Sequence, residues 1–596
     1  MHKEFRSLLS LSQAQSIVLD RLPVIDKEKV CLDHAFRRIL AEKIVSKIDV
    51  PNFNRASMDG YAVRSHDTLE AREDRPICLR LAGCVPVGAV PEVDVEPGKT
   101  IEVSTGSMMP NNSDSVIMIE YSEASEGYVL VRRPVHIGEN VQEAGSDIML
   151  GEAVLFPGAI ITAREIGVLA AMGQKEVLVR RLRVGLASTG NELVLQGTPL
   201  KSGQIYDINS YSIASAIEAC GGTPVKYGIL HDKREAMIDT LHRMSHECSM
   251  ILLSGSTSAG KSDMIYKILD EIGETIFHGI NLKPGKPTIF GMIKGKPIIG
   301  LPGYPTSALT VFSLLVAPSI RKALGLKSRR DVINGRMTRP ARSEGRHQML
   351  SIGFRRGLVY PVDKGSGSIT TLSQADGVIE IPAEVEYLER GEEVEVQLFE
   401  ELFEPDLIIA GENCPALEMM AEALPYQIRF MPNGVQGIIF LEDGLLDMAC
   451  ISRREADGLD IPQKFMLLGG YTRELGLMSR DDILLQPENM TNRSIQGWSR
   501  DSDMREILLS SLKDIGVDST ILKFIGQART HSAVAASVAS GKTDLGFGER
   551  AVSESNKLAF RRLAWNRVEL IVARSSLEKE AMKAFVSYFK STQLKE

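Results

Sequence analysis

The sequence is poor in the features that mark secreted, zinc-binding and nucleic-acid-binding proteins. Its 7 cysteines are an odd number, spread from Cys31 to Cys450 without a Cys-x-x-Cys pair, which argues against a disulfide framework and a structural zinc site. Its formal net charge of -8 gives no electrostatic footprint for nucleic acid. We therefore expect a protein of a reducing compartment with no nucleic-acid partner.

Long uninterrupted apolar runs are also lacking. Arg164 and Glu165 interrupt the centre of the best candidate, residues 153–173, and the run from Thr310 to Ile320 is too short to cross a bilayer. The first six residues contain an acid and no long apolar core, unlike a secretory signal. These observations predict a soluble, cytoplasmic protein with no membrane partner.

The remaining composition is that of a globular protein with several domains. A chain of 596 residues is too long for a single core, and 43% hydrophobic with 24% charged residues are ordinary globular values. Residues 1–180 alternate short β-rich runs with Gly and Pro turns, which predicts one or two small β-rich units.

From residue 181 to 328 the chain alternates strand-like and helix-like segments, which predicts a doubly wound parallel sheet with ligands at the carboxyl ends of its strands. Residues 329–402 resemble a compact all-β unit, expected as a small β-barrel. An acidic run, Glu400 to Glu404, predicts a linker, and residues 406–596 predict a further α/β domain.

One segment matches a phosphate-loop pattern, Gly255-Ser-Thr-Ser-Ala-Gly260-Lys261-Ser262, directly after the apolar run 250–254. Read alone, it favours a nucleotide hydrolase. However, a P-loop hydrolase needs a second acid at the end of a strand to hold the metal ion, and the later run 296–300 ends in Leu-Pro-Gly. We therefore treat the hydrolase as an unfavoured alternative.

Two further glycine turns follow, Leu282-Lys-Pro-Gly-Lys-Pro287 and Gly300-Leu-Pro-Gly-Tyr-Pro-Thr-Ser-Ala308. Backbone N–H groups in such turns bind anions, and lysines add positive charge. Three such turns in one short span predict a binding edge for a phosphorylated ligand.

Eight short words in order give the chain its family resemblance. They are the three turns above and Ser57-Met-Asp-Gly-Tyr-Ala62, Ser104-Thr-Gly106, Gly145-Ser-Asp-Ile148, Ser188-Thr-Gly-Asn-Glu-Leu193 and Gly203-Gln-Ile-Tyr-Asp-Ile-Asn209. Over residues 1–400 the chain resembles the molybdopterin molybdenumtransferases, which include the E domain of gephyrin. The resemblance implies an enzyme of molybdenum cofactor biosynthesis that loads molybdate onto adenylylated molybdopterin and releases AMP.

The resemblance also implies roles for residues. The catalytic set is Asp59, Asp147, Glu192, Asp263, Lys283 and Lys286. The substrate-binding set is Thr105, Ser188, Thr189, Gly190, Asp207, Gly255, Ser256, Ser258, Gly260, Pro302, Gly303, Pro305 and Ser307. Glu192 and Asp263 would hold Mg²⁺, since hard oxygen ligands suit that ion. Residues 181–328 would then be the molybdopterin-binding domain.

In the family, the positions of Asp59 and Thr105 face the site from the partner subunit, which implies a homodimer assembled through residues 1–180. A molybdopterin adenylyltransferase is a further possible partner. The chain departs from the family at Ser256, where a glycine is usual, at Lys261, where a glutamate is common, and at Tyr304, where an asparagine is often found.

Residues 406–596 resemble the periplasmic-binding-protein-like domain of the LysR substrate-binding type that is fused to some family members. Words such as Ile409-Ala-Gly411 and Asp544-Leu-Gly-Phe-Gly548 support this. Glycine and hydroxyl turns at helix starts suit a small anionic or polar ligand between two lobes. A second function class therefore stays open, a sensor of molybdate or a related anion that has lost turnover.

Overall fold

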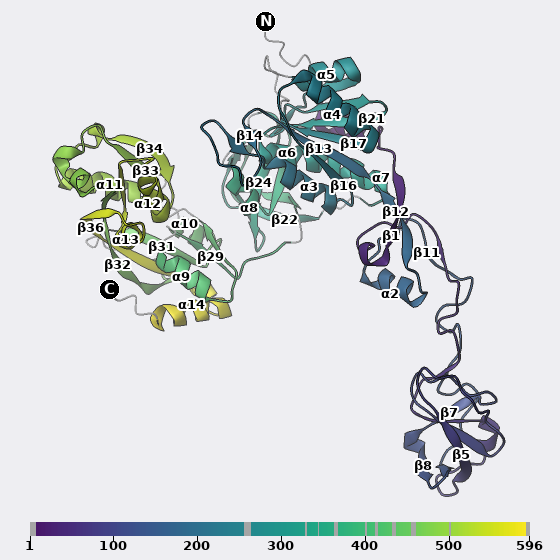
Figure 1. Ribbon diagram of the computed structural model, residues 1–596. Helices are drawn as coiled ribbons and strands as arrows, with labels where there is room; N and C mark the ends of the chain where they lie inside the picture. Colours follow the sequence, from purple (N-terminus) through teal and green to yellow (C-terminus); the bar gives the residue numbers. More distant parts are fainter. Residues whose placement is uncertain are drawn as a thin grey trace.

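The computed structural model describes residues 8–255, 264–327, 331–343, 345–362, 368–399, 402–411, 415–431, 437–453, 461–499 and 502–591. The chain forms an elongated molecule, with a β-rich lobe at one end, an α/β domain and a small barrel in the middle, and the C-terminal domain at the other end (Figure 1). The predicted multidomain fold of α/β and β parts is confirmed.

The N-terminal region contains two β-rich units. One is a projecting lobe with a six-stranded sheet in the order β7-β4-β6-β5-β9-β8. The second is built where the chain enters and leaves that lobe, because β1 pairs with β12 and β2 pairs with β11. The bounds are α1 (Leu11–Leu19), β1 (Asp26–Cys31), β2 (Ile44–Val45), β3 (Arg55–Ala56), β4 (Gly60–Val63), β5 (Ile77–Val85), β6 (Lys99–Val103), β7 (Ser115–Met118), β8 (Ser122–Ser125), β9 (Tyr128–Val131), β10 (Val141–Gln142), β11 (Ala153–Leu155), α2 (Ala163–Ala171) and β12 (Glu176–Arg181).

The α/β domain has a six-stranded sheet in the order β16-β13-β17-β21-β20-β18. Its strands are β13 (Arg183–Thr189), β16 (Thr223–Leu230), β17 (Met250–Ser254), β18 (Glu274–His278), β20 (Ile289–Ile293) and β21 (Lys296–Leu301). The first four strands in this order are parallel, as predicted. Strand β20 runs antiparallel to both of its neighbours, β21 and β18. The predicted parallel arrangement therefore holds for these four strands, and β20 makes the sheet mixed. The cause is a two-residue turn with φ of 47° at Lys294 and 73° at Gly295, which makes β20 and β21 a hairpin.

Helices cover both faces of this sheet. One face packs against α1, α3 (Asn209–Ala219), α6 (Pro305–Val311) and α7 (Ala317–Leu324), and the other against α4 (Arg234–Glu247) and α5 (Met264–Ile272). The helical stretch Pro305–Leu324 is apolar and long enough to span a membrane by length and composition, but 56% of it is buried inside the protein. It packs as a core helix of this domain.

The small barrel is closed, with β24-β25-β22-β28-β26 in a ring completed by a pairing of β24 with β26. A strand of the α/β domain, β19 (Leu282–Lys283), adds to it by pairing with β24. The bounds are β22 (Val332–Met337), β23 (Ala341–Arg342), β24 (His347–Arg355), β25 (Leu358–Pro361), α8 (Ile369–Gln374), β26 (Gly377–Ile381), β27 (Tyr387–Leu388) and β28 (Glu393–Leu398). One strand thus connects the barrel directly to the predicted lysine turn.

The C-terminal domain has an eight-stranded sheet in the order β30-β29-β31-β36-β32-β35-β33-β34. The long antiparallel pair β32 (Phe465–Ser479) and β36 (Ala559–Ala573) runs through both halves of the domain, with apolar cores on either side. The other elements are β29 (Leu407–Ala410), α9 (Pro415–Ala423), β30 (Ile428–Met431), α10 (Gly437–Glu442), β31 (Met448–Arg453), β33 (Ser494–Trp498), α11 (Asp503–Asp514), β34 (Lys523–Ala528), α12 (His531–Ala539), β35 (Leu545–Glu549), α13 (Arg550–Ser555) and α14 (Glu580–Ser591).

The barrel and the C-terminal domain share an apolar core. Tyr360 and Val362 of the barrel lie in one cluster with Ile408, Phe440 and Leu445 of the C-terminal domain. Polar contacts surround the cluster, among them ion pairs Arg429–Asp376 and Arg390–Asp443. The acidic run predicted as a linker therefore joins two domains that are packed against each other.

Candidate functional site

The carboxyl ends of three parallel strands meet at one edge of the α/β sheet. Ser188 of β13 is in register with Ser254 of β17, and Ser254 is in register with Leu301 of β21. The turns that follow begin with Gly190, Gly255 and Pro302. Two of the three predicted glycine turns, those that begin at Gly255 and Pro302, therefore start at one sheet edge, together with the turn of Gly190.

Two of the turns approach each other closely, and the turn of Gly255 leaves no room for a side chain. Gly255 has φ of +100°, and a Cβ there would lie 2.4 Å from the carbonyl oxygen of Thr189. A Cβ on Gly303 would lie 3.6 Å from Cα of Gly255. Gly255 therefore combines a left-handed backbone with close packing, which only glycine tolerates, and the edge is a compact backbone surface.

Asn209, at the start of α3, ties these turns together. Its amide nitrogen Nδ2 donates to Ser254 Oγ at 2.6 Å and to the carbonyl oxygen of Gly303 at 2.8 Å. The side chain is buried, and its Oδ1 has no hydrogen-bond partner among the described residues. Asn209 was not predicted as a site residue, although it belongs to the family word Gly203–Asn209.

Asp207 lies at the base of the same edge. Its Oδ1 accepts from Ser188 Oγ at 2.8 Å and from the backbone N–H of Ser210 at 3.2 Å. The residue is 1% exposed, and its Oδ2 lacks a hydrogen-bond partner within the described part of the chain. Asp207 therefore holds Ser188 and the start of α3 in place through Oδ1. Its Oδ2 remains able to accept a hydrogen bond.

Glu192 is an exposed carboxylate on the turn after β13. Its oxygens lie next to Gly190, where a Cβ would be 2.7 Å from Oε2. The neighbouring Asn191 donates from Nδ2 to Asp232 Oδ2 at 3.0 Å and accepts from the N–H of Asp232 at 3.1 Å. Asp232 thus lies in the site but was missed, although its place just after β16 matches the ligand edge of a parallel sheet.

The lysine turn lies against the helix that starts at the site. A Cβ on Gly285, which has φ of +125°, would be 2.6 Å from Cγ2 of Val311 in α6. Thr288 Oγ1 donates to the carbonyl oxygen of Gly285 at 2.7 Å, and the carbonyl of Lys286 accepts from two backbone N–H groups. The side chains of Lys283 and Lys286 are partly buried, so this turn is an ordered cationic element.

The third turn leads into α6 through Pro302, Gly303, Tyr304 and Pro305. Pro302 and Ser307 are buried, whereas Gly303 and Tyr304 are exposed. Tyr304 precedes the helix with an extended backbone, and its carbonyl accepts the first helical bond, from the N–H of Ala308 at 2.9 Å. The starts of α3 and α6 therefore both lie at this edge, and the start of α6 can stabilise an anion there.

Part of the predicted site lies outside the described residues. This applies to Ser256, Ser258, Gly260 and Asp263, and also to Lys261. Among the residues that the structure describes, no group of three or more His, Cys, Asp or Glu side chains gathers as a metal centre.

Three predicted residues lie elsewhere in the chain. The backbone N–H of Thr105 donates to Asp59 Oδ1 at 2.7 Å, so these two residues are together, but they belong to the projecting lobe. Asp147 is exposed on the segment that leads out of that lobe. Figure 1 shows the lobe, with β5, β7 and β8, well separated from the domain of β13 and β17. One chain therefore does not bring Asp59 and Thr105 to Glu192.

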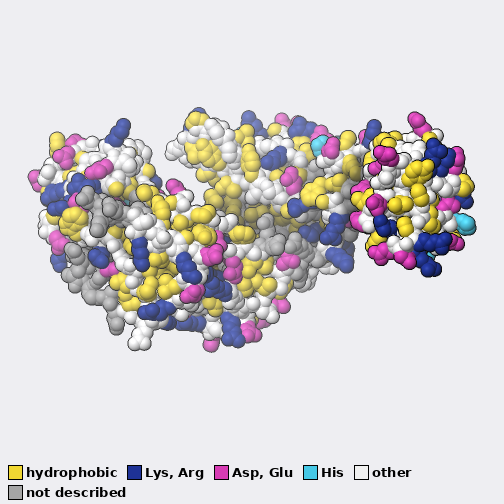
Figure 2. Space-filling view, turned by 90° about the horizontal axis from the view of Figure 1, so that it is seen from below, with side chains coloured by type: hydrophobic (Ala, Val, Ile, Leu, Met, Phe, Trp, Pro, Cys, Tyr) yellow, Lys and Arg dark blue, Asp and Glu magenta, His cyan; other side chains and the backbone are white. Residues whose placement is uncertain are grey.

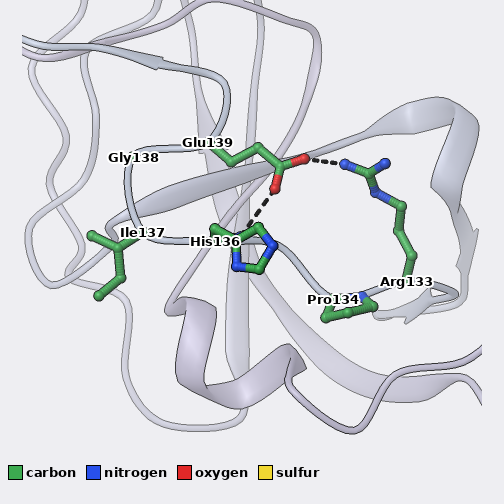
Figure 3. A pocket seen from close by; sticks show the side chains of 6 residues that line it. All are labelled: Arg133, Pro134, His136, Ile137, Gly138 and Glu139. Atoms are coloured by element: carbon green, nitrogen blue, oxygen red, sulfur yellow. Dashed lines mark hydrogen bonds and ion pairs between the residues drawn. The ribbon is translucent and has the colours of Figure 1, made fainter.

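An open surface hollow of about 790 Å³ lies on the projecting lobe, lined by the loop from Arg133 to Glu139. Figure 3 shows Glu139 bonded to the Arg133 guanidinium and to the N–H of His136, the latter at 3.0 Å. These bonds hold the loop in place. None of the predicted site residues lines this hollow.

Models of four protein families match consecutive stretches of the chain. They are the MoeA N-terminal region (domain I and II) over residues 9–173, a probable molybdopterin binding domain over 185–322, the MoeA C-terminal region (domain IV) over 334–399, and a PBP superfamily domain over 433–590. The second match covers the sheet edge with Gly190, Gly255 and Gly303.

Individual proteins are similar over the same stretches. A molybdopterin molybdenumtransferase of Haemophilus influenzae is 35% identical over 323 residues, which is 54% of this chain and 79% of that protein. Molybdopterin molybdenumtransferase 2 of Mycobacterium tuberculosis is 29% identical over 403 residues, 65% of this chain and 98% of that protein. The crystal structure of a molybdopterin biosynthesis MoeA protein from Pyrococcus horikosii has 39% sequence identity and a TM-score of 0.59, covering 66% of this chain and all of that one.

Proposed function

We propose that this chain, which belongs to the molybdopterin molybdenumtransferase family, inserts molybdate into adenylylated molybdopterin and releases AMP. The observation that carries the proposal is the convergence of the turns at Gly190, Gly255 and Gly303 on one sheet edge. Such an edge binds a pyrophosphate group, and this substrate contains one. The resemblance found in the sequence is thereby confirmed at the level of the family.

The residues of this edge divide the work. Backbone N–H groups of the turns and the start of α6 hold the phosphate oxygens, while Lys283 and Lys286 neutralise their charge. Molybdate is itself an oxyanion, so the same cations also attract it. Asn209 and Asp207 position the turns through the hydrogen bonds to Ser254, Gly303 and Ser188.

We also propose that the site takes a magnesium ion. Glu192 presents exposed oxygens at the turn after β13, and Asp232 Oδ1 is a buried oxygen without a hydrogen-bond partner in the described chain. Glu192 and Asp232, with Asp263, would hold Mg²⁺, whose hard oxygen ligands usually include several waters. When bound, Mg²⁺ supplies charge neutralisation to the phosphate oxygens.

We further propose a homodimer in which Asp59 and Thr105 of one chain complete the site of the other. Their separation from Glu192 in the same chain supports this, since they cannot act there. Large apolar side chains are also exposed in the N-terminal region, including Met149 at 63%, Leu150 at 64% and Phe156 at 58%. Figure 2 shows hydrophobic side chains among charged ones over the projecting lobe.

The proposal extends to the location of the protein and to its other ligands and partners. A cytoplasmic location agrees with the free state of all six described cysteines, and a passing contact with a molybdopterin adenylyltransferase agrees with the shared substrate. A small polar ligand of the C-terminal domain agrees with buried polar residues between its two halves. There, Arg473 donates from Nε to Asn566 Oδ1 at 2.9 Å and from Nη2 to Ser452 Oγ at 2.8 Å.

The transferase is tested by incubating the full chain with adenylylated molybdopterin, molybdate and Mg²⁺. We expect release of AMP together with active cofactor, and ATP hydrolysis at background. A chain that releases no AMP but binds molybdate tightly in its C-terminal domain would favour the anion sensor. The similarities to known proteins do not favour that alternative. Magnesium-dependent ATP turnover that Lys261→Ala abolishes would favour the hydrolase.

A further inference from the structure

Tyr304 is an exposed aromatic side chain at the edge of the anion-binding turns. It is 62% exposed, more than Tyr387 at 52%, Tyr128 at 50% and Tyr211 at 49%. It follows Gly303 directly, and Gly303 contacts both the turn of Gly255 and the amide of Asn209. The ring of Tyr304 therefore lies next to the glycine turns of Gly255 and Gly303, which are proposed to bind the phosphates.

The backbone fixes the direction of this side chain. Pro305 follows it at the first helical position, and Tyr304 has φ of −71° and ψ of 131°. A residue before proline is held in this extended region, and Gly303 is held by the hydrogen bond from Asn209 at 2.8 Å. The Cα–Cβ bond is thus anchored on both sides, although the ring itself is free to meet solvent.

No packing or capping role accounts for the ring within the described part of the chain. Tyr304 makes no side-chain cap bond to α6, and no hydrogen bond or ring contact of its side chain occurs among the described residues. A lone exposed tyrosine is common on protein surfaces. Its place beside a binding edge, on an anchored backbone, is what gives it a function.

We propose that Tyr304 is a stacking platform for a fused heteroaromatic ring of the substrate and determines how tightly that ring is held. This inference rests on the proposed function, because adenylylated molybdopterin carries two such rings, a pterin and an adenine, joined through the phosphates that the cradle holds. An aromatic face stacks on either ring with centroids about 4.5 to 7 Å apart. The asparagine that often occupies this position in the family has no such face.

Stacking of this kind holds the substrate and the transition state alike, so it changes KM and leaves kcat unaltered. We expect Tyr304→Asn to raise KM about tenfold at constant kcat, and Tyr304→Phe to stay within about twofold of wild type, since the ring face is kept. Tyr387→Asn is the matched control, because Tyr387 is a similarly exposed tyrosine on β27 of the barrel.

Binding measurements on the full chain identify the ring. AMP and a phosphorylated pterin are titrated separately into wild type, Tyr304→Asn and Tyr387→Asn by calorimetry. Loss of about tenfold in affinity for AMP alone assigns the adenine, and loss for the pterin alone assigns the pterin. In Tyr304→Trp, either ring should quench the added tryptophan fluorescence on binding.

Two results overturn the inference in distinguishable ways. In the first, wild type binds AMP or the pterin, and Tyr304→Asn binds each as tightly as wild type does, with an unchanged KM. Tyr304 then does not stack on a substrate ring, and the proposed function stands. If wild type binds neither probe and releases no AMP, the proposed function fails and the platform fails with it.

Discussion

Arg355 and Asp447 form an ion pair across the boundary between the small barrel and the C-terminal domain, and each side chain is 1% exposed. Asp447 also accepts from the N–H of Ile408 at 2.8 Å, from Ser576 Oγ at 2.7 Å and from Lys579 Nζ at 2.9 Å. A buried carboxylate with this many donors is fully compensated. The C-terminal domain is therefore attached to the core by more than its covalent connection.

Removing one partner of this pair should be costly. We expect Asp447→Ala to destabilise the C-terminal domain by about 3 to 5 kcal/mol, because the Arg355 guanidinium is left buried without its counter-charge. The double variant Arg355→Met with Asp447→Leu should lose less. Both tryptophans, Trp498 and Trp565, lie in this domain, so the urea midpoint of tryptophan fluorescence measures it. Equal losses in the single and double variants would contradict the assignment.

The same pair predicts a loss of stability in acid. Burial acts to raise the pKa of Asp447, but Arg355, Lys579, Ile408 and Ser576 outweigh it and hold the pKa below the usual 3.8. A carboxyl whose pKa is lowered on folding stabilises the protein above its unfolded pKa and loses that contribution as the pH falls through the folded value. We expect the urea midpoint of the wild-type protein to fall when the pH is lowered below about 4. The midpoint of Asp447→Asn should fall less over the same pH range. Parallel pH profiles for the two proteins would refute this.

Cutting the chain after Glu404 separates catalysis from this attachment. All residues of the proposed site lie before the cut, so residues 1–404 should keep kcat/KM for AMP release. Tyr360 and Val362, which are buried against the C-terminal domain, become exposed, so the melting temperature should fall by roughly 4 °C or more. An inert truncated core beside an active full chain would show that the C-terminal domain is needed for turnover.

Glu192 should affect turnover rather than binding. If its carboxylate holds Mg²⁺, Glu192→Ala removes charge neutralisation that matters in the transition state and leaves the contacts to Lys283 and the glycine turns intact. We expect kcat to fall roughly a hundredfold, with substrate affinity nearly unchanged. Glu152→Ala, at an exposed acid of the N-terminal region, serves as control. Wild-type rates in Glu192→Ala, measured as AMP release, would remove Glu192 from the site.

Mixing two inactive proteins tests the proposed homodimer. Asp59→Ala and Glu192→Ala each disable one half of the proposed composite site, so a heterodimer retains one intact site. After subunit exchange we expect about one quarter of wild-type activity, since half of the dimers are mixed and each has one site of two. If subunits exchange and no activity returns, Asp59 does not act across the interface.

Local sequence signals predicted much of the fold. The run Met250–Ser254 is a fully buried parallel strand, and α3 and α6, which start at Asn209 and Pro305, belong to the alternation of strands and helices predicted for residues 181–328. These elements are encoded within a few neighbouring residues, by continuous apolar runs or by a proline at the first turn. The hairpin of β20 and β21 is also encoded locally, by the Lys294-Gly295 turn. It was not predicted from the sequence.

Site residues that belong to short sequence motifs were predicted. Residues that reach the site only through the three-dimensional fold were missed. Gly190, Gly255 and Gly303 were named from their turns, whereas Asp232 enters the site through its hydrogen bonds to Asn191, 41 residues away. Its place just after a strand is the one local signal, and because a polar residue after a strand is common, that signal alone does not select it. The packing of Arg355 on Asp447 spans 92 residues, and the acidic run between them suggested a free linker instead.

Strand β24 constrains how this protein can change in evolution. Its first residues, His347 and Gln348, are in register with Leu282 and Lys283, and its last residue is Arg355. A single inserted or deleted residue within the strand would turn every following side chain to the opposite face, removing Arg355 from Asp447 or moving the strand that carries Lys283. Family members that carry a docked C-terminal domain of this kind should therefore keep the length of this strand constant, even where their sequences differ.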